Sequence, residues 1–167
     1  MDVRPERPED VQPIHAVTAA AFREVARSDQ SEPDIILRLR AAGALSVSQV
    51  ATDGDRVVGH VALSPVRING IAGAWYGLGP VSVLPERQGQ GIGQALVRSG
   101  LEALRARSAH GCVVLGDPAY YARFGFAWDP GLTYGQVPPG YFQRLVFEGP
   151  SPTGEVAYHP AFGPHEA

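Results

Sequence analysis

Residues 83–93 read VLPERQGQGIG, and this stretch decides how the chain is expected to fold. Gly89, Gly91 and Gly93 stand at alternate positions, where a strand gives way to a helix expected from Ile92 to about Arg107. Glycine lets the backbone turn sharply and lets a ligand approach without meeting a Cβ atom. Because the first turn of a helix has unpaired N–H groups and a positive dipole end, the expected ligand is a phosphate or pyrophosphate. The alternative is that the glycines only form a tight turn.

The residues after the loop predict a parallel pair of strands. The helix is followed at residues 112–115 by the apolar run CVVL, which is typical of a fully buried strand. A strand, a helix and a second strand at this spacing form a βαβ unit with parallel strands and a right-handed crossover. The further elements expected are a short helix at Pro118–Arg123 and strands near Phe126, at Tyr141–Glu148 and at Glu155–Tyr158.

The residues before the loop predict antiparallel strands. Asp53-Gly54-Asp55 and Asn69-Gly70 are hairpin signals, and they separate three consecutive runs with strand character. The expected elements are a strand around Val3, helices from Pro8 to Val25 and from Pro33 to about Ala42, and strands at Ala44–Thr52, at Arg56–Val66 and ending at Val83. On the second helix, Arg38 and Arg40 are expected to face solvent. The predicted fold class is α/β (α+β): a mixed, mostly antiparallel sheet flanked by helices, with a central parallel βαβ unit.

Composition bounds the kind of protein. The chain has 167 residues, of which 44% are hydrophobic and 19% charged, as in one globular domain. We expect a domain over residues 1–149, with a tail at 150–167 that packs on it or extends it. All 14 basic residues are arginine, so chemistry that needs a lysine Schiff base or a Walker A lysine is excluded. A formal net charge of −3 argues against nucleic acid as the main partner.

The sequence gives no sign of a membrane or an exported protein. No apolar run approaches the roughly 18 residues of a membrane-spanning helix, and the first residues lack the apolar stretch of a signal peptide. Cys112 is the sole cysteine, which fits a reducing cytoplasm. It is expected to be an inert buried residue. The predicted location is the cytoplasm.

Two other kinds of site fit poorly. A dinucleotide fold needs Gly-x-Gly-x-x-Gly, but the third position is Gln94 when counted from Gly89 and Leu96 when counted from Gly91. The spacing of His110, His159 and His165 does not suggest zinc, so no metal is expected.

The loop resembles the acetyl-CoA-binding motif of the GNAT N-acetyltransferases, Gln/Arg-x-x-Gly-x-Gly/Ala. Gln88, Gly91 and Gly93 fill its three defined positions. Residues 120–126, YYARFGF, resemble the later Tyr-x-x-x-Gly-Phe element of that family. The segments LGPV at 78–81 and LGDP at 115–118 point to the bacterial YhbS-like group within it.

The resemblance implies an acetyl-CoA site and a direct reaction. The pantetheine arm would insert between the two parallel strands, and the pyrophosphate would rest on the backbone amides of the glycine loop. A neutral amine would attack the thioester without a covalent acyl-enzyme, and proximity would supply much of the rate. A backbone amide near Val81–Val83 would polarise the carbonyl. The implied cofactor-binding residues are Val81, Ser82, Val83, Gln88, Gly89, Gln90, Gly91, Ile92, Gly93, Gln94 and Asp117.

The catalytic assignments are less constrained. Tyr121 occupies the family's tyrosine position and is the predicted general acid for the leaving thiolate; its alternative is a core aromatic. The base is open between His60, Glu24, Glu32 and a chain of waters. His60 lies within an apolar run, so its alternative is a hydrogen-bonded core histidine.

The sequence therefore predicts an acetyl-CoA-dependent N-acetyltransferase. Its acceptor is expected to be a small primary amine rather than a protein amine. The alternative is a non-catalytic acyl-CoA-binding or regulatory module on the same fold, which the absence of an acid from residues 75–81 favours. No nucleic acid or membrane partner is expected, and a homodimer stays open.

Overall fold

The structure, a computed structural model, describes residues 1–163 and divides into two compact units. The first unit holds residues 1–63 and 79–103; the second holds residues 64–78 and the chain from Leu104 on. His165 and the last residues of the predicted tail lie outside the described residues. The predicted boundary between a domain and a tail near residue 149 stays a prediction.

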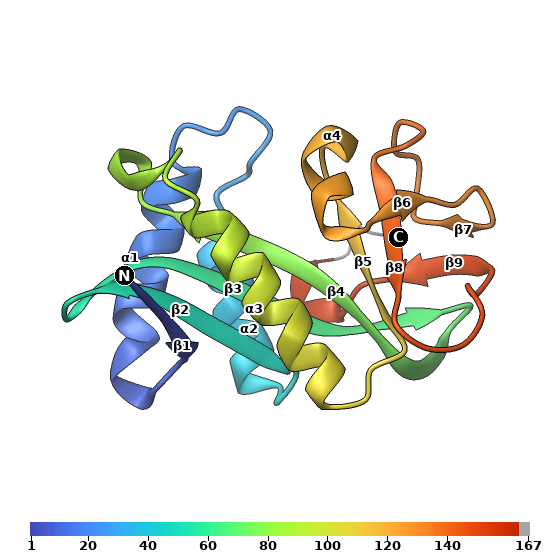
Figure 1. The fold of residues 1–167 in the computed structure, drawn as a ribbon, viewed down its shortest axis with the longest axis horizontal. Helices are drawn as coiled ribbons and strands as arrows, with labels where there is room; N and C mark the ends of the chain where they lie inside the picture. The colour runs from blue at the N-terminus through green and yellow to red at the C-terminus, as the bar shows by residue number, and fades with distance from the viewer. Residues whose placement is uncertain (164–167) are drawn as a thin grey trace. The chain divides into compact units, whose positions relative to one another are not determined.

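The sheet is mixed, with the strand order β1-β2-β3-β4-β5-β8-β6; β9 pairs with β3 and with β7 (Figure 1). Its strands are β1 (Asp2–Pro5), β2 (Val47–Asp53), β3 (Arg56–Ile68), β4 (Ile71–Val83), β5 (Gly111–Leu115), β6 (Ala127–Trp128), β7 (Leu132–Thr133), β8 (Phe142–Val146) and β9 (Gly154–Ala157). The α-helices are α1 (Val11–Phe22), α2 (Glu32–Ala41), α3 (Ile92–Ala106) and α4 (Pro118–Tyr121). Short 3-10 turns are η1 (Pro8–Asp10), η2 (Pro85–Arg87), η3 (Ala122–Phe124) and η4 (Pro160–Phe162). The predicted fold class is confirmed.

The first unit places helices on both faces of its strands. Figure 1 shows α3 in front of these strands and α1 and α2 behind them. Gly59 of β3 allows α3 to approach, since a Cβ there would lie 2.9 Å from Leu96 Cδ1. Successive side chains of a strand point to opposite faces, so His60 points away from α3, towards the side of α1 and α2.

The second unit is built on the predicted parallel pair. Its ladder has three residue pairs, Trp75 with Gly111, Tyr76 with Cys112 and Gly77 with Val113. One face of this unit carries an apolar core formed by Val66, Trp75, Val113, Leu132, Phe142 and Val156. Although β4 continues to Val83 and β5 to Leu115, the paired register ends at Gly77 and Val113.

Some local predictions were wrong. Helix α1 ends at Phe22 rather than Val25, because the chain there turns through hydrogen bonds from Val25 N to Phe22 O and from Ser28 N to Val25 O. Leu115 ends the apolar run but is 45% exposed, because the chain leaves the strand at Gly116. Strand β7 was not predicted; with two residues, it gives no detectable periodicity.

Candidate functional site

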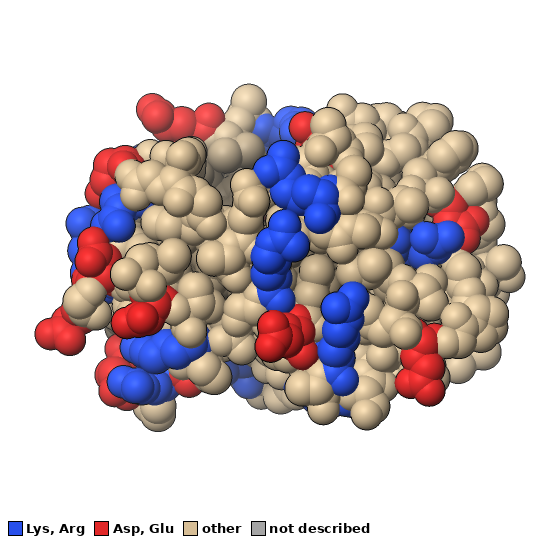
Figure 2. Space-filling view, in the orientation of Figure 1, with Lys and Arg blue, Asp and Glu red and all other residues tan. Residues whose placement is uncertain are grey.

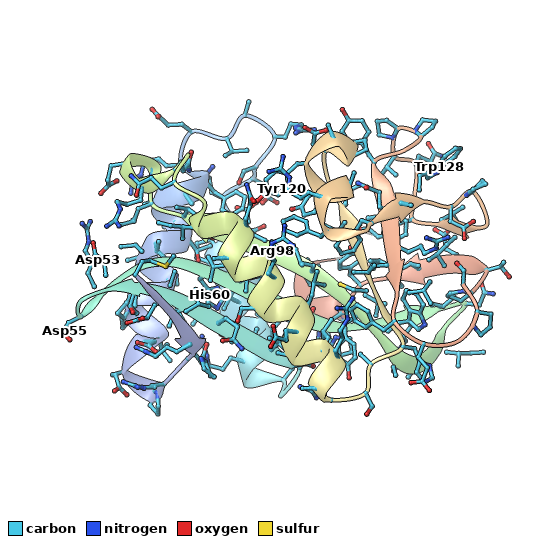
Figure 3. All side chains as sticks on the ribbon, in the orientation of Figure 1. Asp53, Asp55, His60, Arg98, Tyr120 and Trp128 are labelled. Carbon is cyan, nitrogen blue, oxygen red and sulfur yellow. The ribbon has the colours of Figure 1, made fainter. Side chains whose placement is uncertain are left out.

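The loop between β4 and α3 is held in place by its own side chains. Gln88 Nε2 donates a hydrogen bond of 3.2 Å to the carbonyl oxygen of Val83. Arg87 donates from Nη1 to Asp53 Oδ2 (2.9 Å) and from Nε to Gln90 Oε1 (3.2 Å). Figure 3 labels Asp53 at the β2–β3 hairpin, so this ion pair links the loop to a second turn of the first unit. The first motif glutamine therefore shapes the loop.

Two glycines of the loop adopt a conformation that other residues avoid. The φ angles of Gly89 and Gly91 are +79° and +82°, in the left-handed region. A Cβ added at either glycine would meet no atom within 4 Å, so the backbone there faces open space. These glycines are therefore needed for backbone shape, and the open space leaves room for a ligand.

The start of α3 adds hydrogen-bond donors to this open backbone. The helix begins at Ile92, and Ala95 N donates to Gly91 O at 3.1 Å. The amides of Ile92, Gly93 and Gln94 precede this bond and belong to the first turn, where helical acceptors are missing. Converging N–H groups at a helix N-terminus suit an anion such as a pyrophosphate.

The end of β4 leads directly into the loop. Ser82 is 1% exposed, and the described residues offer its Oγ no hydrogen-bond partner. Val81 and Val83 are half-buried. The structure thus brings the predicted residues 81–94 together as one strand end, loop and helix start within the first unit.

In the second unit, Tyr121 lies at the end of the short helix α4 and packs on Gly116. A Cβ at Gly116 would lie 2.5 Å from Tyr121 Cε2. The ring also contacts Tyr120, with 5.0 Å between the ring centroids, and Phe126, with 5.9 Å. Burial, followed by Tyr120 and Cys112, raises the pKa of Tyr121 to about 12. The phenol therefore stays protonated at neutral pH and can donate a hydrogen bond.

Asp117 has a structural task in the segment before Tyr121. Its Oδ1 accepts a hydrogen bond of 2.9 Å from Ala119 N and so caps α4. Gln143 of β8 fixes the neighbouring backbone, because its Nε2 donates to Gly116 O at 3.3 Å. This cap explains why an aspartate stands at position 117. The predicted cofactor role of Asp117 stays a prediction.

Tyr120 and Cys112 pack against neighbouring residues of the second unit. The guanidinium of Arg123 lies 4.6 Å above the Tyr120 ring, a cation–π contact. The side chain of Cys112 is fully buried, and burial raises the pKa of its thiol. Cys112 is therefore inert at neutral pH, as predicted.

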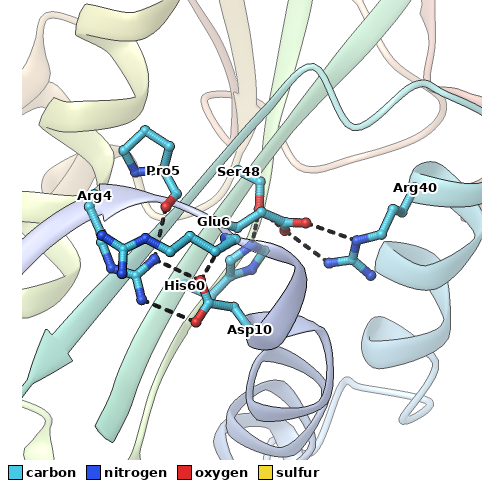
Figure 4. A network of polar contacts seen from close by, with 8 residues as sticks. Arg4, Pro5, Glu6, Asp10, Arg40, Ser48 and His60 are labelled. Carbon is cyan, nitrogen blue, oxygen red and sulfur yellow. Dashed lines mark hydrogen bonds and ion pairs between the residues drawn. The ribbon is translucent and has the colours of Figure 1, made fainter. Parts of the chain in front are cut away.

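His60 belongs to a polar network that the sequence did not reveal (Figure 4). Its Nε2 lies 2.8 Å from Ser48 Oγ, and Ser48 Oγ in turn donates to Glu6 Oε1. Arg40 of α2 forms two hydrogen bonds with the Glu6 carboxylate, from Nε at 3.0 Å and from Nη2 at 2.9 Å. The prediction that Arg40 faces solvent is therefore wrong, because Glu6 draws its guanidinium inward. Beside this network, Arg4 pairs with Asp10 at 2.7 Å.

The network fixes the protonation of His60. Because the single Ser48 hydroxyl proton goes to Glu6, His60 Nε2 carries the hydrogen that Ser48 accepts. Nδ1 has no hydrogen-bond partner among the described residues, as expected for the unprotonated nitrogen of a neutral ring. Burial is the largest cause that lowers the pKa of His60 to about 4, and Arg40 lowers it further, whereas Glu6 opposes the shift. His60 is thus neutral and 0% exposed.

The other base candidates, Glu24 and Glu32, lie in the first unit. Glu24 is exposed in the turn after α1. Glu32, at the start of α2, accepts a hydrogen bond of 2.6 Å from Ser28 Oγ.

Basic side chains lie over α3 (Figure 2), and residues 1–163 hold no candidate metal site. Figure 2 shows basic side chains over α3, where Arg98 and Arg105 are exposed with Glu102 between them. Figure 3 labels Arg98 on this helix. Within residues 1–163, no group of three His, Cys, Asp or Glu side chains could hold a metal ion. None of the helices in this part of the chain is long and apolar enough to cross a membrane.

Comparison with known proteins settles the family. The model of the Acetyltransferase (GNAT) family matches residues 12–126, which include the glycine loop and the Tyr121 element. The chain belongs to the GNAT acetyltransferase family. This GNAT chain is also 39% identical over 127 residues to the Escherichia coli K12 protein named as an uncharacterized N-acetyltransferase, YhbS, a match that covers 75% of this chain and 73% of that protein.

Two solved GNAT structures are similar over almost the whole chain. A GNAT family acetyltransferase from Brucella melitensis, in complex with acetyl-CoA, is 52% identical with a TM-score of 0.87 and covers 97% of each chain. Escherichia coli YhbS, in complex with CoA, is 34% identical with a TM-score of 0.85, covering 96% of this chain and 91% of that one. The predicted family, its YhbS-like group and the fold class are confirmed.

Proposed function

We propose that this chain transfers the acetyl group of acetyl-CoA to a small primary amine by direct attack of the amine on the thioester. The observation that carries the proposal is the open glycine loop at the start of α3. Gly89 and Gly91 hold it in a left-handed conformation with no atom near a Cβ. The similar Brucella melitensis protein, 52% identical over 97% of both chains, was solved with acetyl-CoA.

The donor is held mainly by backbone groups. The pyrophosphate accepts hydrogen bonds from the amides of the loop and of the first turn of α3, where the helix dipole is positive. The pantetheine arm runs along β4 beyond Gly77, the last β4 residue that pairs with β5. The residues proposed for these roles are Val81, Ser82, Val83, Gln88, Gly89, Gln90, Gly91, Ile92, Gly93, Gln94 and Asp117.

Tyr121 is proposed to assist departure of the CoA thiolate. With a pKa of about 12, its phenol is protonated when the carbon–sulfur bond breaks. An ordinary thiol has a pKa of about 8.5, so the phenol stabilises the thiolate by a hydrogen bond more readily than by complete proton loss. The proton that the thiolate finally takes comes from the attacking amine, which must lose one.

The identity of the base is a separate proposal. His60 is neutral and has a free ring nitrogen, as a base requires, but it is fully buried and bonded to Ser48. This geometry supports its alternative role as a core histidine. Glu24, Glu32 or a chain of waters then takes the proton from the amine, and the thiolate finally takes up one proton in exchange.

A non-catalytic acyl-CoA-binding module is the second candidate. It is favoured by the lack of a carboxylate in β4 between Trp75 and Val83. We also propose that the protein acts in the cytoplasm, as a single domain over residues 1–149. It has no nucleic acid or membrane partner in this proposal, and a homodimer stays open. The sole cysteine, which is buried and has no second cysteine in the chain to pair with, supports the cytoplasm.

The deciding experiment is calorimetric titration with acetyl-CoA. Gly91→Trp should abolish binding, because the indole would fill the space where the loop backbone meets the ligand. The matched control is Gly43→Trp, at a glycine after α2 that also has positive φ (+69°) and open space around it. Wild-type protein that does not bind acetyl-CoA would refute the proposal.

A second measurement separates the two candidates. A panel of small primary amines is incubated with acetyl-CoA and the protein, and free thiol is followed. Amine-dependent thiol release identifies the transferase, whereas tight acetyl-CoA binding without release identifies the binding module.

A further inference from the structure

The β2–β3 hairpin and the turn η2 are joined by two ion pairs of opposite polarity. Asp53 of the hairpin accepts a hydrogen bond from Arg87 Nη1 at 2.9 Å. Arg56 of the same hairpin donates from Nη2 to Glu86 Oε2 at 3.2 Å. All four residues belong to the first unit, and η2 comes directly before the glycine loop. The hairpin therefore holds the chain at the point where it enters the loop.

The ion pair between Asp53 and Arg87 continues into the loop itself. Arg87 Nε donates to Gln90 Oε1 at 3.2 Å, and Gln90 stands between Gly89 and Gly91. The side chain of Arg87 is 23% exposed, whereas both partners of the second ion pair are about 60% exposed. Networks with ordered geometry contribute more than isolated exposed pairs. Arg87 thus connects a rigid hairpin to the centre of the loop.

The two glycines at the centre of the loop make such a connection useful. Gly89 and Gly91 both have positive φ, and a Cβ on either would meet no atom within 4 Å. Glycine has the greatest backbone freedom, so little in this part of the loop fixes its shape. A ligand that binds one loop conformation loses affinity in proportion to the time that the loop spends in others. A bond that fixes the loop therefore raises affinity without contacting the ligand.

We infer that Asp53 positions the glycine loop for acetyl-CoA through Arg87 and thereby sets part of the affinity. The inference rests on the proposed function, in which this loop holds the pyrophosphate. Asp53 is a positioning residue, because its carboxylate bonds to Arg87. Its charge makes the inference distinctive, since a carboxylate near an anionic ligand repels that ligand. Removal of this carboxylate should weaken binding when Asp53 positions the loop, and strengthen binding when only its charge acts.

The test is calorimetric titration of the full chain with acetyl-CoA. Asp53→Ala should raise the Kd by about fivefold, the upper end expected for one ion pair near the surface. Asp55→Ala is the matched control, because it removes the same charge from the same hairpin, where Figure 3 labels both residues. Asp55 is exposed and has no ion-pair partner within residues 1–163. Its removal should leave the Kd unchanged or lower it slightly.

A double variant tests whether Asp53 acts through Arg87. Arg87→Ala alone should raise the Kd by about tenfold, because it removes both side-chain bonds and a positive charge beside the loop. Adding Asp53→Ala to this variant should weaken binding no further, since residues that act through one contact are not additive. A further fivefold loss in the double variant would show that Asp53 acts by another route, and would overturn the inference.

Thermal unfolding checks that each variant is folded before titration. Asp53→Asn keeps the shape of the side chain and one acceptor oxygen, so it should raise the Kd by a smaller factor; it replaces Asp53→Ala if that variant does not fold. An unchanged or lower Kd in the folded Asp53 variant overturns the inference alone, as does equal weakening by Asp55→Ala. Failure of wild-type protein to bind acetyl-CoA overturns the proposed function and this inference with it.

Discussion

The protonation state and the role of a single residue in this protein depend on its neighbours in the fold, and His60 shows this. His60 stood in an apolar run, and the sequence left it open whether it is a base or a core residue. The structure gives it Ser48 as a partner, and Ser48 links it to Glu6 and Arg40. Glu6 and Arg40 are far apart in sequence, so no local pattern pointed to their contact.

Burial of neutral His60 predicts how stability depends on pH. The pKa of His60 is about 4 in the folded protein and about 6.5 when unfolded. As pH falls through 6.5 the unfolded chain takes up a proton that the folded protein refuses until about pH 4, so stability falls across this window. The loss approaches about 3 kcal/mol at pH 4. Denaturant unfolding at pH 7, 6, 5 and 4.5 measures it.

The control for this pH dependence is His60→Gln, whose amide can still reach Ser48. It should unfold with a shallower pH dependence above pH 4.5. The pKa values of Glu6 and Asp10 lie below their ordinary values of 4.5 and 3.8, so their stabilisation is lost mainly below about pH 5. The comparison between pH 7 and pH 5 therefore reports on His60. Equal slopes for the two proteins would show that His60 is not the titrating group.

Tyr121→Phe tests the second residue with a proposed chemical role. The change removes the hydroxyl and keeps the ring that packs on Gly116. We expect kcat to fall by about a hundredfold while the Kd for acetyl-CoA changes little, because the hydrogen bond forms as the thiolate leaves. Thiol release and calorimetry give the two values. Tyr120→Phe is the matched control, and equal turnover in both variants would show that the Tyr121 hydroxyl does not assist departure of the thiolate.

At the scale of elements, turns were predicted better than ends and long-range contacts. Asp53-Gly54-Asp55 and Asn69-Gly70 located both hairpins, since these residues favour positive φ: Gly54 has +61°, Asn69 +52° and Gly70 +75°. The glycine loop was located for the same reason. The end of α1 was missed because Val25 keeps the helical spacing while the chain already turns. The contact of the Tyr158 ring with Gly77 was missed because only the fold brings these two residues together.

A substitution in the glycine loop tests whether its positive φ angle matters even where a side chain has room. Gly91→Ala puts a Cβ where φ is +82° but where no atom lies within 4 Å. We expect a loss of about 1 kcal/mol in unfolding free energy from the strained backbone, together with weaker acetyl-CoA binding. Gly43→Ala carries the same kind of strain (φ +69°) in the turn after α2. It should lose similar stability and keep its affinity, measured by denaturation and calorimetry; weaker binding in both variants would count against the loop.

At the scale of the whole molecule, family and reaction class were readable because two motifs occur in the right order around a βαβ unit. The acceptor was not readable, because its recognition depends on side chains from distant parts of the chain. Composition adds one global property: every basic side chain is an arginine, so the protein has no lysine amine for its own acetyl group to reach.

The lysine-free surface predicts the pattern of self-modification. After prolonged incubation with acetyl-CoA, any acetylation should lie at Met1 or on a non-lysine group, with no stable internal amide, as mapped by mass spectrometry of peptides. Arg98→Lys provides the positive control, because it places one primary amine on the exposed face of α3. A stable acetyl amide at any internal position of the wild-type chain would contradict the expectation.

The pairing of β9 with β3 has a consequence for synthesis on the ribosome. The hairpins of the first unit can form as soon as they emerge, since their partners are neighbours in sequence. The contact between the Tyr158 ring and Gly77, by contrast, cannot form until β9 and Tyr158 have been translated. This contact is therefore among the last parts of the fold to be completed.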